Sequence, residues 1–315
     1  MVVLDRFDSL FELIGTLSSE EQCIEYLEKI RWRGRVVSPF DVTSKVYKCS
    51  AGYWCKNSNR LFNVKTGTIF ENTKIPMRKW FMAIWILSSH KKGISSVQLS
   101  KDINVTQKTG WFMLQRIRRC FECDYQHQLN NEVEVDETYL GGNLSVKRKR
   151  RGGAVSNSLS DKPQIPIIGM VERRGRLISH IITDAHSSTL TSEILKMVDR
   201  GATLYTDEWG GYDAVGDLYR HYVIRHKVRE YVNGHISTNT IECFWGVLKR
   251  GLSGIYQNPS KKHLQMYINE FVFRYNTRDM NDYDRFNILL SRVAKRLRYR
   301  DLIDVKYCRA DVISV

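Results

Sequence analysis

The sequence predicts a mixed α/β (α+β) protein with two or three domains. Two observations lead to this prediction. The chain has 315 residues, 42% of them hydrophobic, which is enough for more than one sizeable core. The hydrophobic pattern also changes along the chain: helical spacing is common in the first 120 residues, whereas short β-branched runs alternate with helical patterns from about 130 to 300.

The first 120 residues are expected to form helices and one small β-rich module. Residues 7–30 show helical spacing, and 36–75 contain turns and short β-rich runs. Residues 76–119 then begin with an apolar helix that Gly93 breaks. A turn at 102–105 and a candidate N-cap at Thr106 introduce the last helix. This segment has the pattern of a helix-turn-helix.

The second part of the chain is expected to contain one open sheet covered by helices. Its predicted strands are 132–140, 165–173, 176–184, 202–207 and 220–225, and its predicted helices are 187–200, 239–253, 261–276 and 283–297. Three strands, a helix, a strand, a short connection, a strand and a further helix is the order of an RNase H-like fold.

Charge and cysteine content limit the possible partners and compartments. The net charge is +15 and the pI is about 9.5, which indicates a polyanionic partner. No apolar run reaches the roughly 18 residues that span a bilayer, and no signal peptide is visible, so we expect no membrane association. Seven scattered cysteines indicate reduced thiols. We therefore expect a cytoplasmic protein, or a nuclear one if the source is eukaryotic.

Three carboxylates stand out from the chain's other acidic residues. Asp136 and Asp207 each come at the end of an apolar strand-like run, where an uncompensated charge is costly. Glu242 lies in a helical pattern, and Lys249, seven residues on, projects from the same side of that helix. Carboxylates that converge repel each other unless a cation is bound between them. Such a set is typical of a site that binds two Mg²⁺ ions for phosphoryl displacement.

These segments closely resemble the DDE transposases. The interval from Asp207 to Glu242 is 242 − 207 = 35 positions, the spacing found in many of these enzymes. Within the superfamily, the chain is similar to the bacterial insertion-sequence transposases of the ISXO type, which are related to the eukaryotic Merlin elements. The matching segments are VDETYLGG (135–142), YTDEWGGY (205–212), HISTNTIECFWGVLKRGLSGIY (235–256) and KKHLQMYINEFVFRYNTR (261–278).

The resemblance implies a two-metal active site. Asp136, Asp207 and Glu242 would hold two Mg²⁺ (or Mn²⁺) ions, and Lys249 would contact a phosphate near the scissile bond. Some members of the family have Asn as the third residue, so Asn239, one turn before Glu242, stays an alternative. We rank Glu242 first because Mg²⁺ prefers anionic oxygen ligands.

Two aromatic residues follow Asp207 closely in the sequence. Trp209 and Tyr212 are expected either to form the wall beside Asp207 or to belong to the core.

In the family, residues 36–75 correspond to a zinc ribbon with two CxxC pairs, and here the ribbon is degenerate. Its four ligand positions are occupied by Ser38, Asp41, Cys55 and Ser58, so only one keeps a sulfur, and Cys49 lies off the pattern. A structural zinc needs four good donors. We therefore expect no stable zinc.

Two basic regions are candidates for DNA binding. The helix-turn-helix would read DNA through Gln107 and Lys108, with Arg116 in its last turn on the phosphates. The polar connection after the first strand of the sheet contains five consecutive cations that would bind phosphates beside the active site: Lys147, Arg148, Lys149, Arg150 and Arg151.

The predicted function is that of a DNA transposase, which cleaves phosphodiesters at transposon ends and joins the 3′-hydroxyl to target DNA. Its partners would be double-stranded DNA (terminal inverted repeats and target DNA) and further copies of the chain, as a homodimer or higher homo-oligomer. The alternatives are a catalytically silent, host-adopted DNA-binding regulator and a plain RNase H-like nuclease. The expected organisation is a helical segment (1–35), the ribbon-like module (36–75), the helix-turn-helix domain (76–125), the catalytic domain (130–300) and a tail (301–315).

Overall fold

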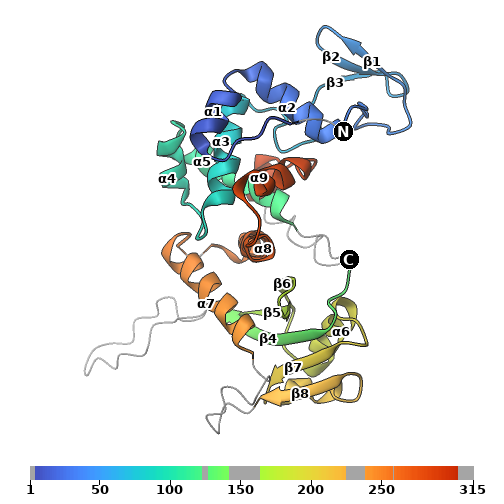
Figure 1. The fold of residues 1–315 in the computed structure, drawn as a ribbon, viewed down its shortest axis with the longest axis vertical. Helices are drawn as coiled ribbons and strands as arrows, with labels where there is room; N and C mark the ends of the chain where they lie inside the picture. Colours follow the sequence, from blue (N-terminus) through green and yellow to red (C-terminus); the bar gives the residue numbers. More distant parts are fainter. Residues whose placement is uncertain (1–3, 123–126, 142–163, 225–237, 258, 304–315) are drawn as a thin grey trace, which may run out of the picture. The chain divides into compact units, whose positions relative to one another are not determined.

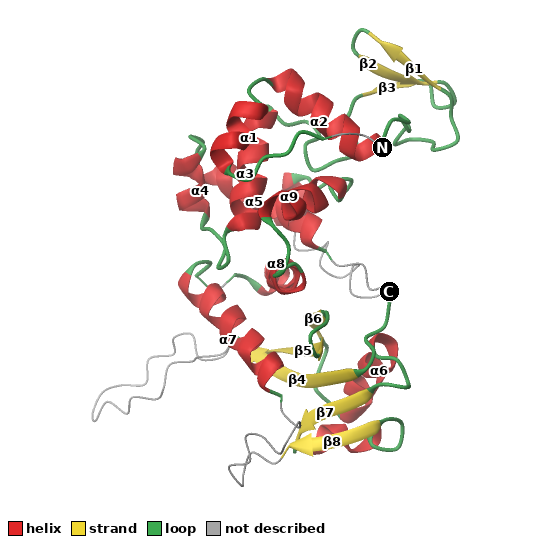
Figure 2. Cartoon of the chain, viewed as in Figure 1, coloured by secondary structure: helices red, strands yellow, loops and turns green. Residues whose placement is uncertain are grey.

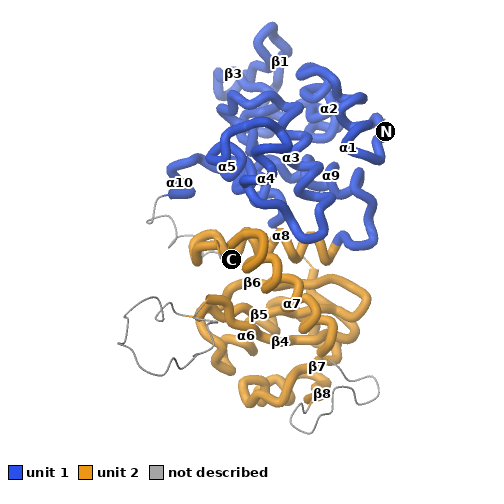
Figure 3. The backbone as a smooth tube through the Cα atoms, turned by 90° about the vertical axis from the view of Figure 1, so that its left-hand side faces the viewer, with its two compact units in different colours: residues 1–122, 277–315 blue, residues 123–276 orange. Residues whose placement is uncertain are grey.

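The computed structural model describes residues 4–122, 127–141, 164–224, 238–257 and 259–303 (Figure 1). The chain divides into two compact units (Figure 3). Unit 1 contains 1–122 and 277–315, and unit 2 contains 123–276. Among the described helices, none has the length and apolar character needed to cross a membrane.

Unit 1 is mainly helical, with one small antiparallel sheet of strand order β1-β2-β3 (Figure 2). Its elements are α1 (Leu10–Thr16), α2 (Glu20–Trp32), β1 (Val46–Cys49), β2 (Gly52–Cys55), β3 (Arg60–Phe62), α3 (Met77–Ser89), α4 (Ser96–Asp102), α5 (Gln107–Arg118), the 3-10 turn η1 (Arg119–Phe121), α9 (Asp282–Ser291) and α10 (Tyr299–Ile303).

Helix α9 belongs to unit 1, although the sequence analysis assigned it to a catalytic domain of 130–300. Its Phe286 packs against the rings of Phe7 and Phe81, and Asn287 accepts a 2.8 Å hydrogen bond from Tyr26 of α2. The apolar face of this helix was visible in the sequence. Periodicity shows that a helix buries one face, but it does not show which partner covers that face.

Helices α4 and α5 are joined by a short turn, as the sequence predicted. The side chain of Ser95 caps α4 and that of Thr106 caps α5, each by accepting from a backbone amide three residues later. Asn104 takes a positive φ of 50° in the turn. Gly110 lets the two helices approach closely, because a Cβ there would lie 3.1 Å from the carbonyl oxygen of Ser96.

Unit 2 is a five-stranded mixed sheet with helices on both faces (Figure 2). Its elements are β4 (Glu132–Leu140), β5 (Ile165–Glu172), β6 (Leu177–Ile181), α6 (Ser187–Met197), β7 (Thr203–Asp207), the 3-10 segment η2 (Gly210–Val215), β8 (Arg220–Ile224), α7 (Asn239–Gly254), the 3-10 turn η4 (Lys261–His263) and α8 (Leu264–Asn276).

The sheet has the strand order β6-β5-β4-β7-β8. Strands β4, β5 and β6 pair antiparallel, whereas β7 runs parallel to β4 and β8 runs parallel to β7. The prediction of a mixed α/β fold is confirmed, and each predicted strand agrees with an observed strand to within a few residues. The strand order and directions agree with the RNase H-like arrangement that the sequence suggested.

Two cores cover the two faces of the sheet. On one face, Val133, Val135 and Leu204 pack with α6 and η2. On the other face, β5 packs with α7 and α8 through a second set of apolar side chains that includes Trp245. Because side chains alternate along a strand, residues 132, 134 and 136 of β4 are on the α7 face. The α7 face is therefore the one on which Asp136 lies.

Candidate active site

Asp136 and Asp207 lie on neighbouring parallel strands and point to the same face of the sheet. The ladder between β4 and β7 pairs Glu134 with Tyr205, and two residues further along each strand stand Asp136 and Asp207. A step of two residues keeps a side chain on the same face. The structure thus brings together two of the three predicted carboxylates.

The Asp136 carboxylate is partly buried and held by two hydrogen bonds. The indole Nε1 of Trp245 on α7 donates to Oδ2 at 2.9 Å, and the backbone amide of Glu137 donates to Oδ1 at 2.9 Å. Burial, followed by the nearby Glu137 and Asp207 carboxylates, raises the pKa of Asp136 to about 7. Bringing these carboxylates together is therefore costly for the protein in the absence of a cation.

Glu137 is a further carboxylate that the sequence analysis did not single out. Burial raises its pKa, and Asp207 adds to the effect. The buried hydroxyl of Tyr212 donates a hydrogen bond to Glu137. Tyr212 is only 1% exposed, so of the two roles left open for it, membership of the core is the one observed.

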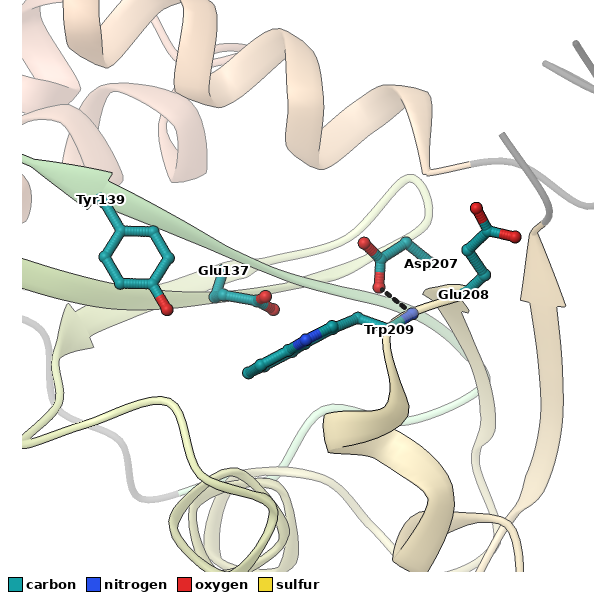
Figure 4. Close-up of a pocket in the computed structure, with 5 residues that line it drawn as sticks. All are labelled: Glu137, Tyr139, Asp207, Glu208 and Trp209. Carbon is teal, nitrogen blue, oxygen red and sulfur yellow. Dashed lines mark hydrogen bonds between the residues drawn. The ribbon is translucent and has the colours of Figure 1, made fainter. Parts of the chain in front are cut away.

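The carboxylates border an open recess of about 400 Å³ (Figure 4). Its lining residues are Glu137, Tyr139, Asp207, Glu208 and Trp209. Oδ1 of Asp207 accepts a 3.1 Å hydrogen bond from the backbone amide of Trp209. The Trp209 ring extends from there toward Glu137 in Figure 4 and is 41% exposed, so it forms part of the wall beside Asp207.

Glu242, Asn239 and Lys249 all lie on α7 and are exposed. The carboxylate of Glu242 accepts a 3.0 Å hydrogen bond from the hydroxyl of Thr238, and Glu242 is one turn before Trp245. In the described part of the chain, no group of three or more His, Cys, Asp or Glu side chains is arranged to hold a metal ion. Glu242 is thus on the helix that contacts Asp136 but is not gathered with the two aspartates.

Two side chains of this site are donors of the kind that a divalent cation such as Mg²⁺ binds. Asp136 lies in the middle of β4, not at its end as the sequence suggested, and Asp207 lies at the end of β7; both offer carboxylate oxygens, which Mg²⁺ and Mn²⁺ prefer. Burial raises the pKa of Asp136 most, and the neighbouring Glu137 and Asp207 carboxylates raise it further; a bound cation would relieve this repulsion between carboxylates. Glu242 or Asn239 would supply the further oxygen ligand from α7.

A glycine in β5 allows α7 to lie this close to the sheet. Gly169 pairs with Asp136 across the β4–β5 ladder. A Cβ at Gly169 would lie 2.6 Å from a ring carbon of Trp245 and 2.7 Å from Cδ1 of Ile241. The absence of a side chain at 169 therefore makes room for the indole that contacts Asp136.

The residues predicted to bind DNA differ in their exposure. Gln107 and Lys108 are exposed at the start of α5. Arg116 is a correction: it is 8% exposed, and its guanidinium donates to the carbonyl oxygens of Ile69 at 2.8 Å and Leu297 at 3.1 Å. An arginine used in this way holds unit 1 together and is not available to a phosphate. The cation run 147–151 lies outside the described residues.

Hydroxyl groups surround the one sulfur kept at the ribbon's ligand positions. Cys55 is buried, and polar groups of Ser38, Ser44 and Ser58 lie beside it. Burial would raise the pKa of the Cys55 thiol, but these neighbouring polar groups outweigh it and lower the pKa to about 6. Asp41 is directed elsewhere, since its carboxylate accepts from Thr43 and Asn57.

Sequence reasoning missed Glu134 and Trp245, which connect β4 to α7. Glu134 is 1% exposed and accepts hydrogen bonds from the first turn of α7. The available signal was the spacing of Glu132, Glu134 and Asp136, which places three acids on one face of a strand. Acidic side chains on a face that a helix covers need hydrogen-bond or ion-pair partners, because a buried charge without them is costly.

A family model and one curated protein match this chain. Residues 128–276 match the model of the ISXO2-like transposase domain. The chain is 32% identical over 279 residues to a protein described as uncharacterized in the transposable element ISH50 of Halobacterium salinarum, covering 83% of this chain and 92% of that protein.

Solved structures resemble the chain more distantly. A simian T-cell lymphotropic virus intasome in complex with a PP2A regulatory subunit has a TM-score of 0.30 at 14% identity, covering 55% of this chain and 63% of that chain. The Mos1 strand transfer complex has a TM-score of 0.29 at 12% identity, covering 70% and 78%.

Proposed function

Because this chain belongs to the ISXO2-like family of insertion-sequence DDE transposases, we propose that it cleaves phosphodiesters at the ends of a DNA element and joins the freed 3′-hydroxyl to target DNA. One observation carries this proposal: Asp136, in the middle of β4, and Asp207, at the end of β7, share a face of the sheet beside the helix that contains Glu242. Double-stranded DNA is the polyanionic partner that a net charge of +15 favours.

Asp136, Asp207 and Glu242 would hold two Mg²⁺ or Mn²⁺ ions, with Asn239 as the alternative to Glu242. Two ions held by these residues would supply activation of the attacking oxygen and charge stabilisation at the leaving oxygen of an in-line displacement. The residues around them orient these carboxylates and hold them in place. Trp245 and the amide of Glu137 fix the Asp136 carboxylate, and the Trp209 amide fixes that of Asp207.

The DNA would be held by positive side chains outside this carboxylate group. Lys249 is exposed on α7 two turns after Glu242, so it would contact a phosphate close to the scissile bond. Gln107 and Lys108 at the start of α5 would read bases, and the cations of 147–151 would bind the backbone. Two copies of the chain or more would assemble on the two element ends.

The experiment that tests this proposal is a cleavage assay on the DNA ends of the chain's own element. Asp136→Asn, Asp207→Asn and Glu242→Gln should each reduce cleavage below detection while leaving DNA binding largely intact, because the metal needs anionic ligands. Asp213→Asn, which removes an exposed carboxylate from η2, is the matched control and should cleave normally.

Two outcomes would change the assignment. Cleavage by Glu242→Gln at near the wild-type rate, together with an inactive Asn239→Ala variant, would make Asn239 the third ligand. A wild-type protein that binds the element ends but cleaves none of them with any divalent cation would favour the silent regulator instead.

A further inference from the structure

A buried carboxylate links the strand of Asp136 to the helix of Glu242. Glu134 lies two residues before Asp136 on the same face of β4 and is 1% exposed. A carboxylate removed from water is costly unless charged or polar partners surround it. The partners of Glu134 therefore indicate what the residue does.

Both oxygens of Glu134 are used, and three of its four hydrogen bonds come from the first turn of α7. Oε2 accepts from the backbone amides of Thr240 at 2.9 Å and Ile241 at 3.1 Å. Oε1 accepts from the hydroxyl of Thr240 at 3.0 Å and from Nε of Arg173 at 3.1 Å. Glu134 thus acts as the cap of a helix that lies far away in the sequence.

Helix α7 has no side-chain cap of its own. The hydroxyl of Thr238, at the N-cap position, donates to Glu242 and accepts no hydrogen bond from a helix amide. The first amides of a helix lack partners inside the helix, so a carboxylate placed there satisfies them and interacts favourably with the positive end of the helix dipole. Glu134 supplies both effects from β4.

Arg173 holds the Glu134 carboxylate in place from the side of the sheet. Its guanidinium contacts Oε2 of Glu132 at 3.3 Å and lies 4.0 Å from the ring centroid of Tyr205 on β7. The hydroxyl of Tyr205 donates in turn to Glu132 at 3.0 Å. This group connects the two aspartate-bearing strands, β4 and β7, to the turn that follows β5.

From this geometry we infer that Glu134 is a positioning residue of the metal centre. It holds the first turn of α7 against β4, and so sets where Asn239 and Glu242 stand relative to Asp136 and Asp207. This inference rests on the proposed function, because it assumes that α7 supplies a ligand to the metal ions. Glu134 is not itself assigned as a metal ligand, because both of its carboxylate oxygens accept hydrogen bonds from α7 and Arg173.

The test compares Glu134→Gln with Asp213→Asn. Glu134 is buried and holds the first turn of α7, whereas Asp213 is an exposed carboxylate on η2, which packs on the other face of the sheet. Mn²⁺ binding to the full chain without DNA is measured by titration calorimetry. Amide exchange of Thr240 and Ile241 is followed by mass spectrometry, and cleavage is assayed as a function of metal concentration.

Glu134→Gln should bind Mn²⁺ roughly 10–100-fold more weakly, the usual effect of removing a residue that orients metal ligands. The amides of Thr240 and Ile241 should exchange faster, and half-maximal cleavage should need correspondingly more metal. Asp213→Asn should keep the wild-type metal affinity and the wild-type exchange at these two amides.

A second pair of variants covers the case in which Glu134→Gln does not fold. Thr240→Val removes only the hydroxyl contact to Glu134, and should weaken Mn²⁺ binding in the same direction but less. Thr240→Ser keeps the hydroxyl and should restore the wild-type affinity.

Unchanged Mn²⁺ affinity in Glu134→Gln, or in Thr240→Val where the first variant is unfolded, would overturn the inference alone, provided that the wild type cleaves. A reduced melting temperature with unchanged metal affinity would mean a purely structural role. A wild type that neither binds Mn²⁺ nor cleaves would overturn the proposed function, and the inference with it.

Discussion

Single residues decide how the Asp136 carboxylate is held. Asp136 receives hydrogen bonds from Trp245 and the amide of Glu137, and Gly169 leaves the space that the Trp245 indole fills. Each of these contacts depends on one side chain or on its absence. Single substitutions can therefore test the contribution of each contact.

Gly169→Ala is expected to destabilise unit 2 by about 1–3 kcal/mol, the usual cost of an extra methyl in a packed core. The new Cβ would meet Trp245 at 2.6 Å and Ile241 at 2.7 Å, so α7 or the indole must shift away from Asp136. Cleavage should fall as well. Urea denaturation and the cleavage assay measure the two effects.

Gly15→Ala is the matched control, because a Cβ at Gly15 in α1 meets nothing within 4 Å. It should be neutral or stabilising by up to about 1 kcal/mol, since alanine is favoured over glycine in a helix. If Gly169→Ala is as stable and as active as this control, the result would contradict the close packing of α7 on β5.

The Cys55 thiol predicts a pH dependence of stability. Its pKa is about 6 in the folded chain, against 9.0 for an ordinary thiol, so the unfolded chain binds more protons between these pH values. The stabilisation is complete above pH 9.0 and is lost as the pH falls through about 6. The free energy of unfolding of the wild type relative to Cys55→Ser should therefore rise from pH 6 to pH 9. Urea denaturation at several pH values measures it, and parallel curves for the two proteins would contradict the low pKa.

At the scale of elements, the small sheet of unit 1 holds Cys49 and Cys55 far apart. Strand pairing places Cys55 opposite Val46, three residues from Cys49 on β1. Three residues along a strand are roughly 10 Å. Two sulfurs on one zinc are only about 4 Å apart, because each Zn–S bond is about 2.3 Å long.

We expect the purified protein to contain less than one zinc per chain. The Ser38 hydroxyl accepts from the backbone amides of Phe40 and Asp41, and the Asp41 carboxylate is occupied by Thr43 and Asn57. Elemental analysis after dialysis measures the metal content. Stoichiometric zinc that disappears on replacing Cys49 and Cys55 would show that the ribbon still binds metal.

At the scale of the whole molecule, DNA is expected to contact both units. The exposed start of α5 belongs to unit 1, whereas the candidate active site and the cation run 147–151 belong to unit 2. Phosphate contacts give affinity without sequence preference, and base contacts give the preference. The two regions should thus have separable effects.

Neutralising Lys147 to Arg151 should weaken binding about equally for element-end and random DNA. The slope of log affinity against log salt should flatten by roughly 0.9 for each phosphate that the variant no longer neutralises. Replacing Gln107 and Lys108 with alanine should instead reduce the difference in binding affinity between element-end DNA and random DNA. Titrating both variants against both DNAs at several salt concentrations tests this, and each variant is the control for the other. If the 147–151 variant loses its preference for element-end DNA and the Gln107 and Lys108 variant keeps it, the roles of the two regions are the reverse of those proposed.

The sequence by itself determined the order of the elements and the identity of the main acidic residues. Alternating β-branched runs end at Asp136 and Asp207, and helical spacing surrounds Glu242, so the five strands and α7 were predicted with nearly correct bounds. These signals are local, because strand and helix periods depend only on neighbouring residues. The long motifs around them were enough to indicate the family.

Only the tertiary structure decided which residues meet. It placed α9 in unit 1, directed Arg116 into the interior, and revealed Glu134 and Trp245 as the contacts between β4 and α7. Neither the partner of an apolar helix face nor the acceptor of an arginine is encoded in a local pattern. A buried glutamate looks like a surface glutamate in the sequence, because its burial is set by a helix that begins more than 100 residues later.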